Sequence, residues 1–182
     1  MRNLELPGRS PAHSIHGMAA TSHTLATMTA ISTLQKGGNA MDAAIAACAV
    51  QCVVEPESTG IGGDCFCIYA PEGTDELIAF NGSGRAPMSA SVDWYRDKGI
   101  YSIEQQSPHS VTVPAAIDAW CQLTLDHGKL DIGEILTPAI RYAQDGYPIS
   151  SRVSADFTMC KDLLKKDPNL ARIFMPNGKT LD

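Results

Sequence analysis

The longest hydrophobic run in the sequence covers residues 43–54, where Gln51 is the only clearly polar side chain. A helix that is hydrophobic on all sides is buried inside a core. Asn39 predicts the N-cap of this helix, and Asp42 stands where a capping box places an acceptor. Pro56 predicts its end, because the residue before a proline avoids helical geometry. We therefore expect this helix to lie at the centre of the fold.

Weaker periodic patterns predict the other elements. Ser22 is predicted to cap a first helix with one apolar face, and the turn residues 71–75 between two apolar stretches predict a β-hairpin. The predicted helices cover 23–36, 91–98, 114–127, 131–144, 151–164 and 169–174, and the predicted strands cover 18–22, 65–70, 76–81 and 107–113. This order indicates an α+β fold. So few strands do not make a self-sufficient sheet under this many helices, so we expect further strands beyond Asp182.

Length and charge narrow the class of protein. The chain has 182 residues, which suits one domain or part of a larger one. The net charge is -6 and no basic run occurs, which argues against a nucleic-acid partner. No stretch reaches the roughly 18 consecutive apolar residues of a membrane span. Residues 1–16 lack the apolar core of a secretory signal. We interpret them as an irregular lead-in before a domain at 17–182, and we expect a cytoplasmic location.

Six cysteines do not form a recognisable metal or disulfide pattern. They stand at positions 48, 52, 65, 67, 121 and 160. A zinc site would need paired Cys-x2-Cys or Cys/His clusters, and none occurs. We therefore predict no metal site and interpret the cysteines as small buried hydrophobic residues.

The glycine-rich turn 60–64, with the sequence GIGGD, has two interpretations. Its backbone N–H groups could bind an anion, or it could be a tight structural turn before a strand. Arg85 is the one cation in the following loop, NGSGRAP, where it could bind a carboxylate or pack the loop. His23 and His109 have no Ser/Cys and Asp partners at a spacing that predicts a triad. The residues alone therefore do not reveal catalytic machinery.

Five blocks in order resemble the gamma-glutamyltranspeptidase family. They are GMAATSHTLAT, LQKGGNAMDAAIAACAVQCVVEPESTGIGGDCF, GRAP, VTVPAAIDAW and LTPAIRYAQDGYPIS, and together they cover residues 17 to about 155. The resemblance implies an N-terminal-nucleophile hydrolase with an αββα sandwich, of which this chain is the N-terminal fragment of the large subunit. Such a protein is made as a precursor that cleaves itself.

The resemblance also implies which groups act. The nucleophile would be the N-terminal threonine of a small subunit, downstream of Asp182, so no catalytic residue is expected in this chain. Glutathione or another γ-glutamyl amide would be the substrate, its acyl group would pass to water or an amine, and no cofactor would be needed. The small subunit would be a partner, and a homo-oligomer is left open. The 182 residues alone are expected to be inactive.

Two positions depart from the family pattern. Many γ-glutamyl enzymes of this family carry R-E-x-A-P, with the arginine holding the substrate's α-carboxylate. Aligned on Ala86-Pro87, Ser83 stands at the arginine position and Gly84 at the glutamate position, and Arg85 comes two places late. Ser83 and Arg85 are therefore the candidate substrate-binding residues. Asp64 also stands where many members have glycine. These departures resemble the cephalosporin-acylase and small-amide amidohydrolase branch, which is the alternative substrate class.

Two interpretations from other classes stay open at the sequence level. The chain could be a truncated, non-catalytic partner or scaffold, which the length of the parent reading frame would decide. It could also be an independent small-molecule-binding domain that uses the glycine turn.

Overall fold

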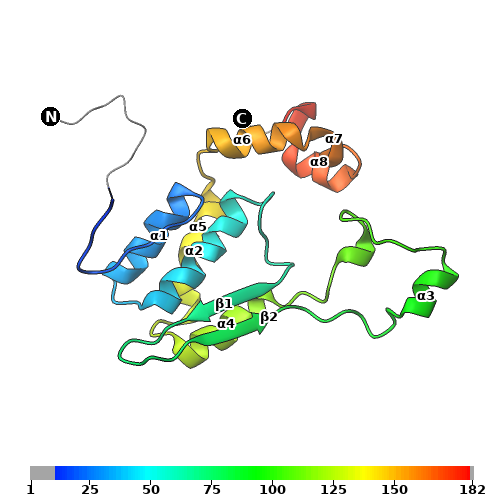
Figure 1. Ribbon diagram of the computed structural model, residues 1–182. Helices are drawn as coiled ribbons and strands as arrows, with labels where there is room; N and C mark the ends of the chain where they lie inside the picture. Colours follow the sequence, from blue (N-terminus) through cyan, green and yellow to red (C-terminus); the bar gives the residue numbers. More distant parts are fainter. Residues whose placement is uncertain (1–10, 181–182) are drawn as a thin grey trace.

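The computed structural model describes residues 11–180 and shows an α+β fold rich in helices (Figure 1), as the order of predicted elements indicated. Within that range no helix is long and apolar enough to cross a membrane. The helices are α1 (Thr24–Gln35), α2 (Ala40–Val54), α3 (Val92–Asp97), α4 (Ala116–His127), α5 (Ile132–Asp145), α6 (Ser151–Met159), α7 (Lys161–Leu164) and α8 (Pro168–Phe174), with short 3-10 turns η1 (Pro108–Ser110) and η2 (Pro176–Gly178) and strands β1 (Cys65–Tyr69) and β2 (Ile78–Gly82).

Helix α2 lies at the centre, as its uniform hydrophobicity predicts. It packs against α1, α4 and α5 and buries the side chains of Ile45, Val50 and Val54. Small side chains let these helices approach closely, and four alanines of α2 are buried: Ala43, Ala46, Ala47 and Ala49. The core of the molecule is therefore built around this helix.

The predicted capping box of α2 is present and also fastens a distant turn. The Asn39 side chain accepts the Asp42 N–H at 3.1 Å, and the Asp42 carboxylate accepts the Asn39 N–H at 2.8 Å. The same carboxylate is fully buried and accepts the backbone N–H groups of Lys129 and Leu130, between α4 and α5. Asn39 also donates to the His127 carbonyl. One cap thus joins the start of α2 to the α4–α5 connection.

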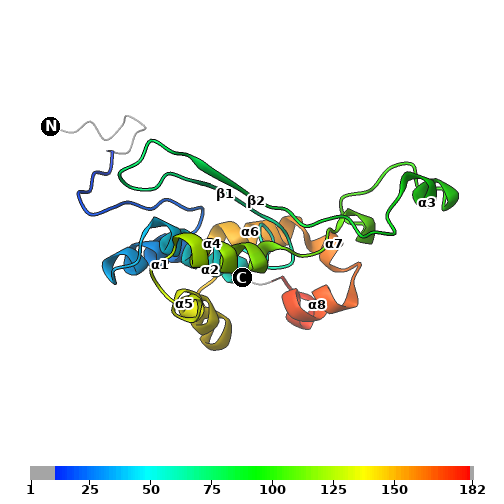
Figure 2. The same cartoon turned by 90° about the horizontal axis from the view of Figure 1, so that it is seen from below.

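Strands β1 and β2 form the predicted antiparallel hairpin. The register runs from Cys65 opposite Gly82 to Tyr69 opposite Ile78. Figure 2 shows the hairpin as the outermost layer on one side of the molecule, with α1, α2 and α4 beneath it and α5 farther away. The inward-facing side chains Cys65, Cys67, Tyr69 and Phe80 pack against the core.

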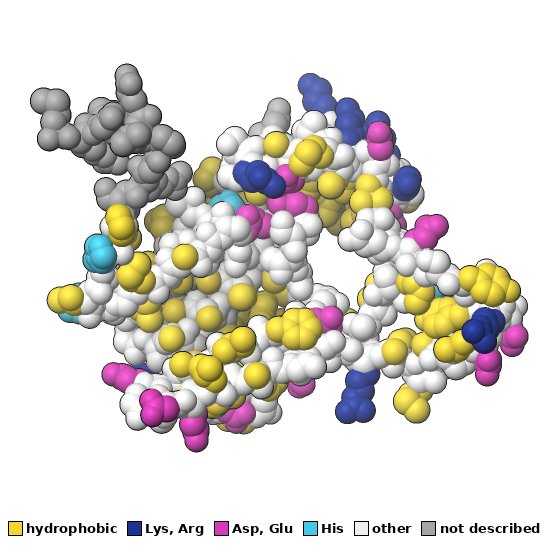
Figure 3. All heavy atoms as spheres, viewed as in Figure 1, with side chains coloured by type: hydrophobic (Ala, Val, Ile, Leu, Met, Phe, Trp, Pro, Cys, Tyr) yellow, Lys and Arg dark blue, Asp and Glu magenta, His cyan; other side chains and the backbone are white. Residues whose placement is uncertain are grey.

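The outer face of the hairpin is apolar and uncovered within residues 11–180. Phe66 is 70% exposed and Ile68 is 79% exposed. Figure 3 shows hydrophobic side chains along the hairpin on the side facing the viewer. Neither strand has a second partner in the described part of the chain.

Two further parts extend from the central helices (Figure 1). Helices α6 to α8 enclose a small core of their own, formed by Val153, Phe157, Leu164 and Met175. Residues 84–113, which we call the arm, leave after β2 and return just before α4, carrying α3 and η1 away from the helices (Figures 1 and 2).

Two predicted strands are absent. Residues 18–22 form no strand among residues 11–180, and Met18 is 58% exposed. Residues 107–113 contain η1 instead, because Pro108 lacks an N–H and the Ser107 hydroxyl caps the turn by accepting the His109 N–H at 3.0 Å. Both segments were predicted from their hydrophobic pattern, but a strand also needs a partner strand, and the pattern does not show whether one is present.

Helix ends differ from prediction in smaller ways. His23 caps α1, with its Nδ1 accepting the Leu25 N–H at 3.2 Å, while Ser22 donates to Glu55 instead. The predicted helix 151–164 is two helices that meet at Cys160.

Candidate functional site

The base of the arm is held together by one carboxylate, that of Asp64. Its Oδ1 accepts the backbone N–H of Gly84 at 2.8 Å and the hydroxyl of Thr112 at 3.1 Å. Gly84 begins the arm and Thr112 lies near its end. The two hydrogen bonds to Asp64 therefore hold the ends of the arm together. A further backbone bond, from Val113 N–H to the Arg85 carbonyl at 3.0 Å, completes the closure. The glycine turn, the loop after β2 and the segment before α4 therefore meet at Asp64.

The two predicted substrate-binding residues lie in this junction. Ser83 and Arg85 flank Gly84, and both are exposed. The Ser83 N–H donates to the Asn81 side chain at 3.0 Å, which turns the chain out of β2. No ion pair involves the Arg85 guanidinium within the described range, so this cation is free to meet an anion. Whether either side chain binds a substrate stays a prediction.

Gly84 is required by the geometry of the loop. A Cβ atom at this position would lie 1.8 Å from the Val113 carbonyl oxygen and 2.8 Å from the Thr112 hydroxyl oxygen. Backbone atoms cannot yield that much, so this loop conformation accepts glycine alone. The glutamate of the R-E-x-A-P pattern therefore cannot stand at position 84 with this backbone.

The glycines of the turn 60–64, unlike Gly84, are not required by close contacts. An added Cβ at Gly60 or Gly62 would meet nothing within 4 Å, and Gly63 would meet only a carbonyl oxygen at 3.8 Å. None of the three has a left-handed backbone. The tight-turn interpretation thus finds no steric reason for the glycines in the described residues. The Gly63 carbonyl accepts the N–H groups of Ala115 and Ala116, which fixes the turn on the start of α4.

The arm is ordered by aromatic contacts away from its base. Trp94 and Tyr95 of α3 meet at a ring-centroid distance of 5.0 Å, and the His109 ring lies 5.7 Å and 5.5 Å from them. Lys98 lies over the Trp94 ring at 4.8 Å. His109 therefore packs α3 against η1 and is neither on a strand nor at the Asp64 junction.

His23 belongs to a second polar cluster, at the C-terminal end of α2. Glu55 is buried and accepts hydrogen bonds from Ser22 and Gln51. His23 is 6% exposed, and its Nε2 and the Glu57 Oε2 are buried without a hydrogen-bond partner among the described residues. The pKa of Glu57 is raised, chiefly by burial and further by the nearby charges of Asp156 and Glu55.

Burial raises the pKa of each of the four cysteine thiols on α2 and β1. Cys48 and Cys52 of α2 approach Cys65 and Cys67 of β1, and burial, with the neighbouring thiols, raises the pKa of Cys48 to about 11. A thiol so seldom ionised is a poor nucleophile. The expectation of buried cysteines is wrong for Cys48 and Cys121, whose residues are exposed although the Cys48 thiol is partly shielded from water, and the other four are half-buried. Within residues 11–180 no group of three His, Cys, Asp or Glu side chains could hold a metal ion.

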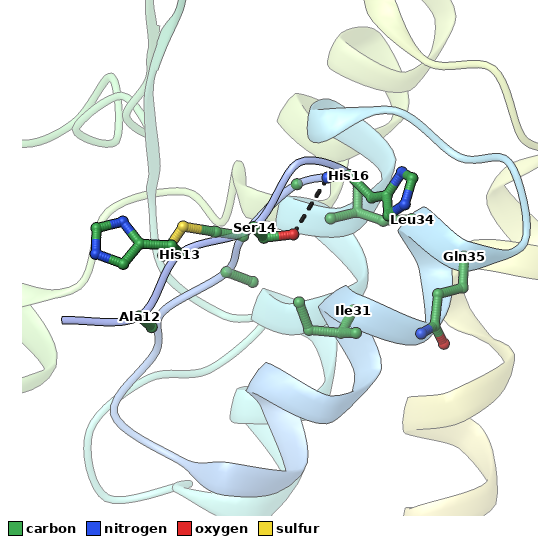
Figure 4. Close-up of a pocket in the computed structure, with 10 residues that line it drawn as sticks. Ala12, His13, Ser14, His16, Ile31, Leu34 and Gln35 are labelled. Carbon is green, nitrogen blue, oxygen red and sulfur yellow. Dashed lines mark hydrogen bonds between the residues drawn. The ribbon is translucent and has the colours of Figure 1, made fainter. Parts of the chain in front are cut away.

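A cavity of about 390 Å³ lies elsewhere, between the lead-in and α1. Figure 4 shows that the His13 and His16 rings lie on opposite sides of Ser14, whose hydroxyl accepts the His16 N–H at 3.2 Å. Because its polar side chains do not converge, this cavity offers no constellation for catalysis.

Sequence reasoning named Ser83 and Arg85 as candidates but did not predict the contacts that Asp64 makes with their loop. The role of Asp64 depends on partners 20 and 48 residues away, which no local pattern reveals. A signal existed at Gly84, since a lone glycine between Ser83 and Arg85 indicates a close backbone approach.

Comparisons with known proteins agree on one family. The family profile described as "Gamma-glutamyltranspeptidase" matches residues 26–182. The chain is 35% identical over 162 residues to the "Glutathione hydrolase-like YwrD proenzyme" of Bacillus subtilis, covering 89% of this chain and 31% of that protein. It is 32% identical over 183 residues to the "Acylase ACY 1 proenzyme" of Pseudomonas sp., covering 95% and 32%. The chain thus spans about a third of the length of these curated relatives.

A solved structure also matches this chain over its full length. The crystal structure of cephalosporin acylase from Bacillus halodurans superposes with a TM-score of 0.85 at 34% identity, covering 100% of this chain and 35% of that one.

Proposed function

Because the chain belongs to the gamma-glutamyltranspeptidase family, we propose that it is the N-terminal part of the large subunit of a self-cleaving amide hydrolase or acyl transferase. The relatives are described as proenzymes and are about three times longer than the matched region. In this proposal the nucleophilic threonine, and the small subunit that begins with it, follow Asp182. Residues 17–182 are then part of an incomplete domain, and the chemistry needs no cofactor.

A terminal threonine suits this chemistry. Its α-amine has a pKa of about 8, near working pH, so it can take the proton of its own hydroxyl as that oxygen attacks the amide carbonyl. The amide C–N bond then breaks, the departing amine takes this proton, and the acyl group passes from the threonine oxygen to water or to an acceptor amine. This chain contributes the substrate-binding side of the pocket.

The uncovered hairpin supports the αββα sandwich as the complete fold. An isolated two-stranded hairpin is marginally stable in water, and its free edges can pair with further strands. Phe66 and Ile68 offer an apolar face that a second sheet would bury. In this proposal the remainder of the precursor supplies those strands.

The observation that carries the proposal is the Asp64 junction. It holds the loop with Ser83 and Arg85 beside a glycine turn that has open space around Gly60 and Gly62. An exposed arginine fork recognises carboxylates through paired, charge-assisted hydrogen bonds. We assign Arg85 to a carboxylate on the acyl group and Ser83 to its hydrogen-bonding neighbour.

Gly84 supports a second substrate class. The loop of this chain admits only glycine at position 84, where many γ-glutamyl enzymes carry glutamate. The loop therefore differs from theirs at the residue that follows the carboxylate-binding position. Acyl groups without an α-amino acid end, as in cephalosporin-type or small amides, are therefore the alternative to γ-glutamyl compounds.

Expression of the complete reading frame tests the enzyme class. We expect a precursor that splits into two chains, with threonine as the first residue of the smaller chain by N-terminal sequencing. The isolated 182-residue chain should not hydrolyse γ-glutamyl anilide. A reading frame that stops after Asp182, without a companion chain, would instead support the non-catalytic scaffold.

Three anilides test the role of Arg85: γ-glutamyl, glutaryl, which lacks the α-amine, and butyryl, which also lacks the carboxylate. Arg85→Ala should raise the KM for the first two about 10- to 100-fold and leave butyryl anilide unchanged, because only a carboxylate loses its partner. Arg96→Ala, on the exposed surface of α3, is the matched control. Equal losses on all three substrates would contradict carboxylate recognition. The cytoplasmic location and the oligomeric state stay predictions.

A further inference from the structure

Asp64 makes its contacts with a single oxygen and at both ends of the arm. Oδ1 accepts the Gly84 N–H at 2.8 Å and the Thr112 hydroxyl at 3.1 Å, across sequence separations of 20 and 48 residues. The residue is thus placed to fix both the departure and the return of the arm.

The backbone around Arg85 is held from two sides by this arrangement. The preceding Gly84 N–H is bound by Asp64, and the Arg85 carbonyl accepts the Val113 N–H at 3.0 Å. Between these two fixed points the Cα–Cβ bond of Arg85 has little freedom. The direction in which the guanidinium leaves the loop therefore depends on Asp64.

At Gly84 the start of the arm lies directly against its end, at Val113. With the Val113 oxygen 1.8 Å from an added Cβ, the two segments touch directly, and a shift of one moves the other. Asp64 is the side chain that links both segments to the turn 60–64.

We propose that Asp64 is a positioning residue, which orients Arg85 for substrate binding by clamping the two ends of the arm through its Oδ1. This inference rests on the proposed function, since it assigns Asp64 to the same site. Asp64 acts here as a hydrogen-bond acceptor. Its negative charge is not needed for contact with the substrate.

Substitutions can separate the role of Asp64 as a hydrogen-bond acceptor from the effect of its negative charge. Asp64→Asn keeps an oxygen at the Oδ1 position, whereas Asp64→Gly removes it. Thr112→Val removes one of the two donors and keeps the shape of the side chain. Asp75→Asn, an exposed acid in the turn between the strands, is the control for loss of one charge.

The first measurement uses the 182-residue chain and does not depend on catalysis. Trypsin can cleave the arm at Arg96 and Lys98, which are exposed on and after α3. We expect cleavage at these sites to be about tenfold faster in Asp64→Gly, since loss of about 1.4 kcal/mol opens a contact tenfold more often. Thr112→Val should fall between, and Asp64→Asn and Asp75→Asn should match the parent chain. Unchanged cleavage in Asp64→Gly would overturn the clamp.

The second measurement uses the complete, self-cleaved enzyme. Asp64→Gly should raise the KM for a carboxylate-bearing anilide about tenfold while kcat falls less than about threefold, because binding rather than attack is affected. Asp64→Asn should restore the parent KM. If Asp64→Asn is as impaired as Asp64→Gly, the charge contacts the substrate and the positioning role is wrong. If no anilide is hydrolysed by the parent enzyme, the proposed function fails, while the cleavage experiment still decides the clamp.

Discussion

At the scale of single residues, the pKa of a side chain depends on neighbours that are distant in the sequence. Glu57 is the clearest case among carboxyl groups, because its pKa is raised by burial first and then by Asp156 and Glu55, with His23 acting in the opposite direction. A raised carboxyl pKa means that the folded state binds the proton more tightly than the unfolded state. The stability from this group is therefore fully present below its unfolded pKa and is lost as pH rises through its folded pKa.

Glu57→Gln should stabilise the chain at pH 7 and have little effect near pH 4. The expected gain at pH 7 is about 0.5 kcal/mol, because the group is partly exposed and solvent screens its charge. Thermal unfolding at the two pH values measures the difference. Glu72→Gln, in the exposed turn between the strands, should show no such pH-dependent gain. A variant that is less stable at pH 7 than the parent would contradict the sign.

At the scale of elements, α2 depends on its N-terminal cap as much as on its hydrophobic sides. The Asp42 carboxylate is fully buried and satisfies the N–H groups of Asn39, Lys129 and Leu130. Buried donors that lose their acceptor retain the cost of their desolvation. The cap therefore contributes to three elements, α2, α4 and α5, at once.

Asp42→Ala should lower the free energy of unfolding by about 3 kcal/mol, since it leaves several buried N–H groups unpaired. Urea unfolding with an unchanged m-value measures the loss. Asp126→Ala, on the exposed side of α4 where the carboxylate bonds only Gln122, should change stability by less than about 0.5 kcal/mol. Equal losses of unfolding free energy in the two variants would show that the buried cap stabilises the fold no more than an exposed carboxylate does.

The sequence predicted the elements whose signals are local. The cap of α2, its central position and the hairpin follow from residues within a few positions of one another, although Ala44 and Cys48 leave part of α2 exposed. Residues 18–22 were predicted as a strand and are not one, because a strand needs a partner that the described chain does not provide. The Asp64 junction was not predicted, because it joins segments up to 48 residues apart. The resemblance to the family pattern named Ser83 and Arg85 as candidates, but it did not reveal the contacts that hold their loop beside the glycine turn.

At the scale of the whole molecule, the outer face of the hairpin is an exposed apolar surface. Phe66 and Ile68 are exposed and lie on the same side of β1, because they are two positions apart on the strand, and both strand edges are unpaired in the described range. Uncovered edges and apolar faces promote association between chains. The 182-residue chain alone should therefore associate with itself.

Ile68→Lys should reduce this self-association several-fold, because a charge on the outer face disfavours sheet contact. Sedimentation velocity over a range of concentrations measures the change. Met88→Lys, on the arm at a fully exposed position, is the matched control and should have no effect. If the two variants behave alike, the hairpin is not the associating surface.

The shared cap at Asp42 also bears on how the chain is made. The carboxylate lies 87 residues before Lys129, the N–H that it binds most closely outside its own helix. During synthesis the central helix emerges before the α4–α5 connection, and domains acquire structure as they leave the ribosome. Until the stretch around Lys129 has been translated, the nascent helix carries a carboxylate that must stay hydrated, so the core can close only late in translation of this segment.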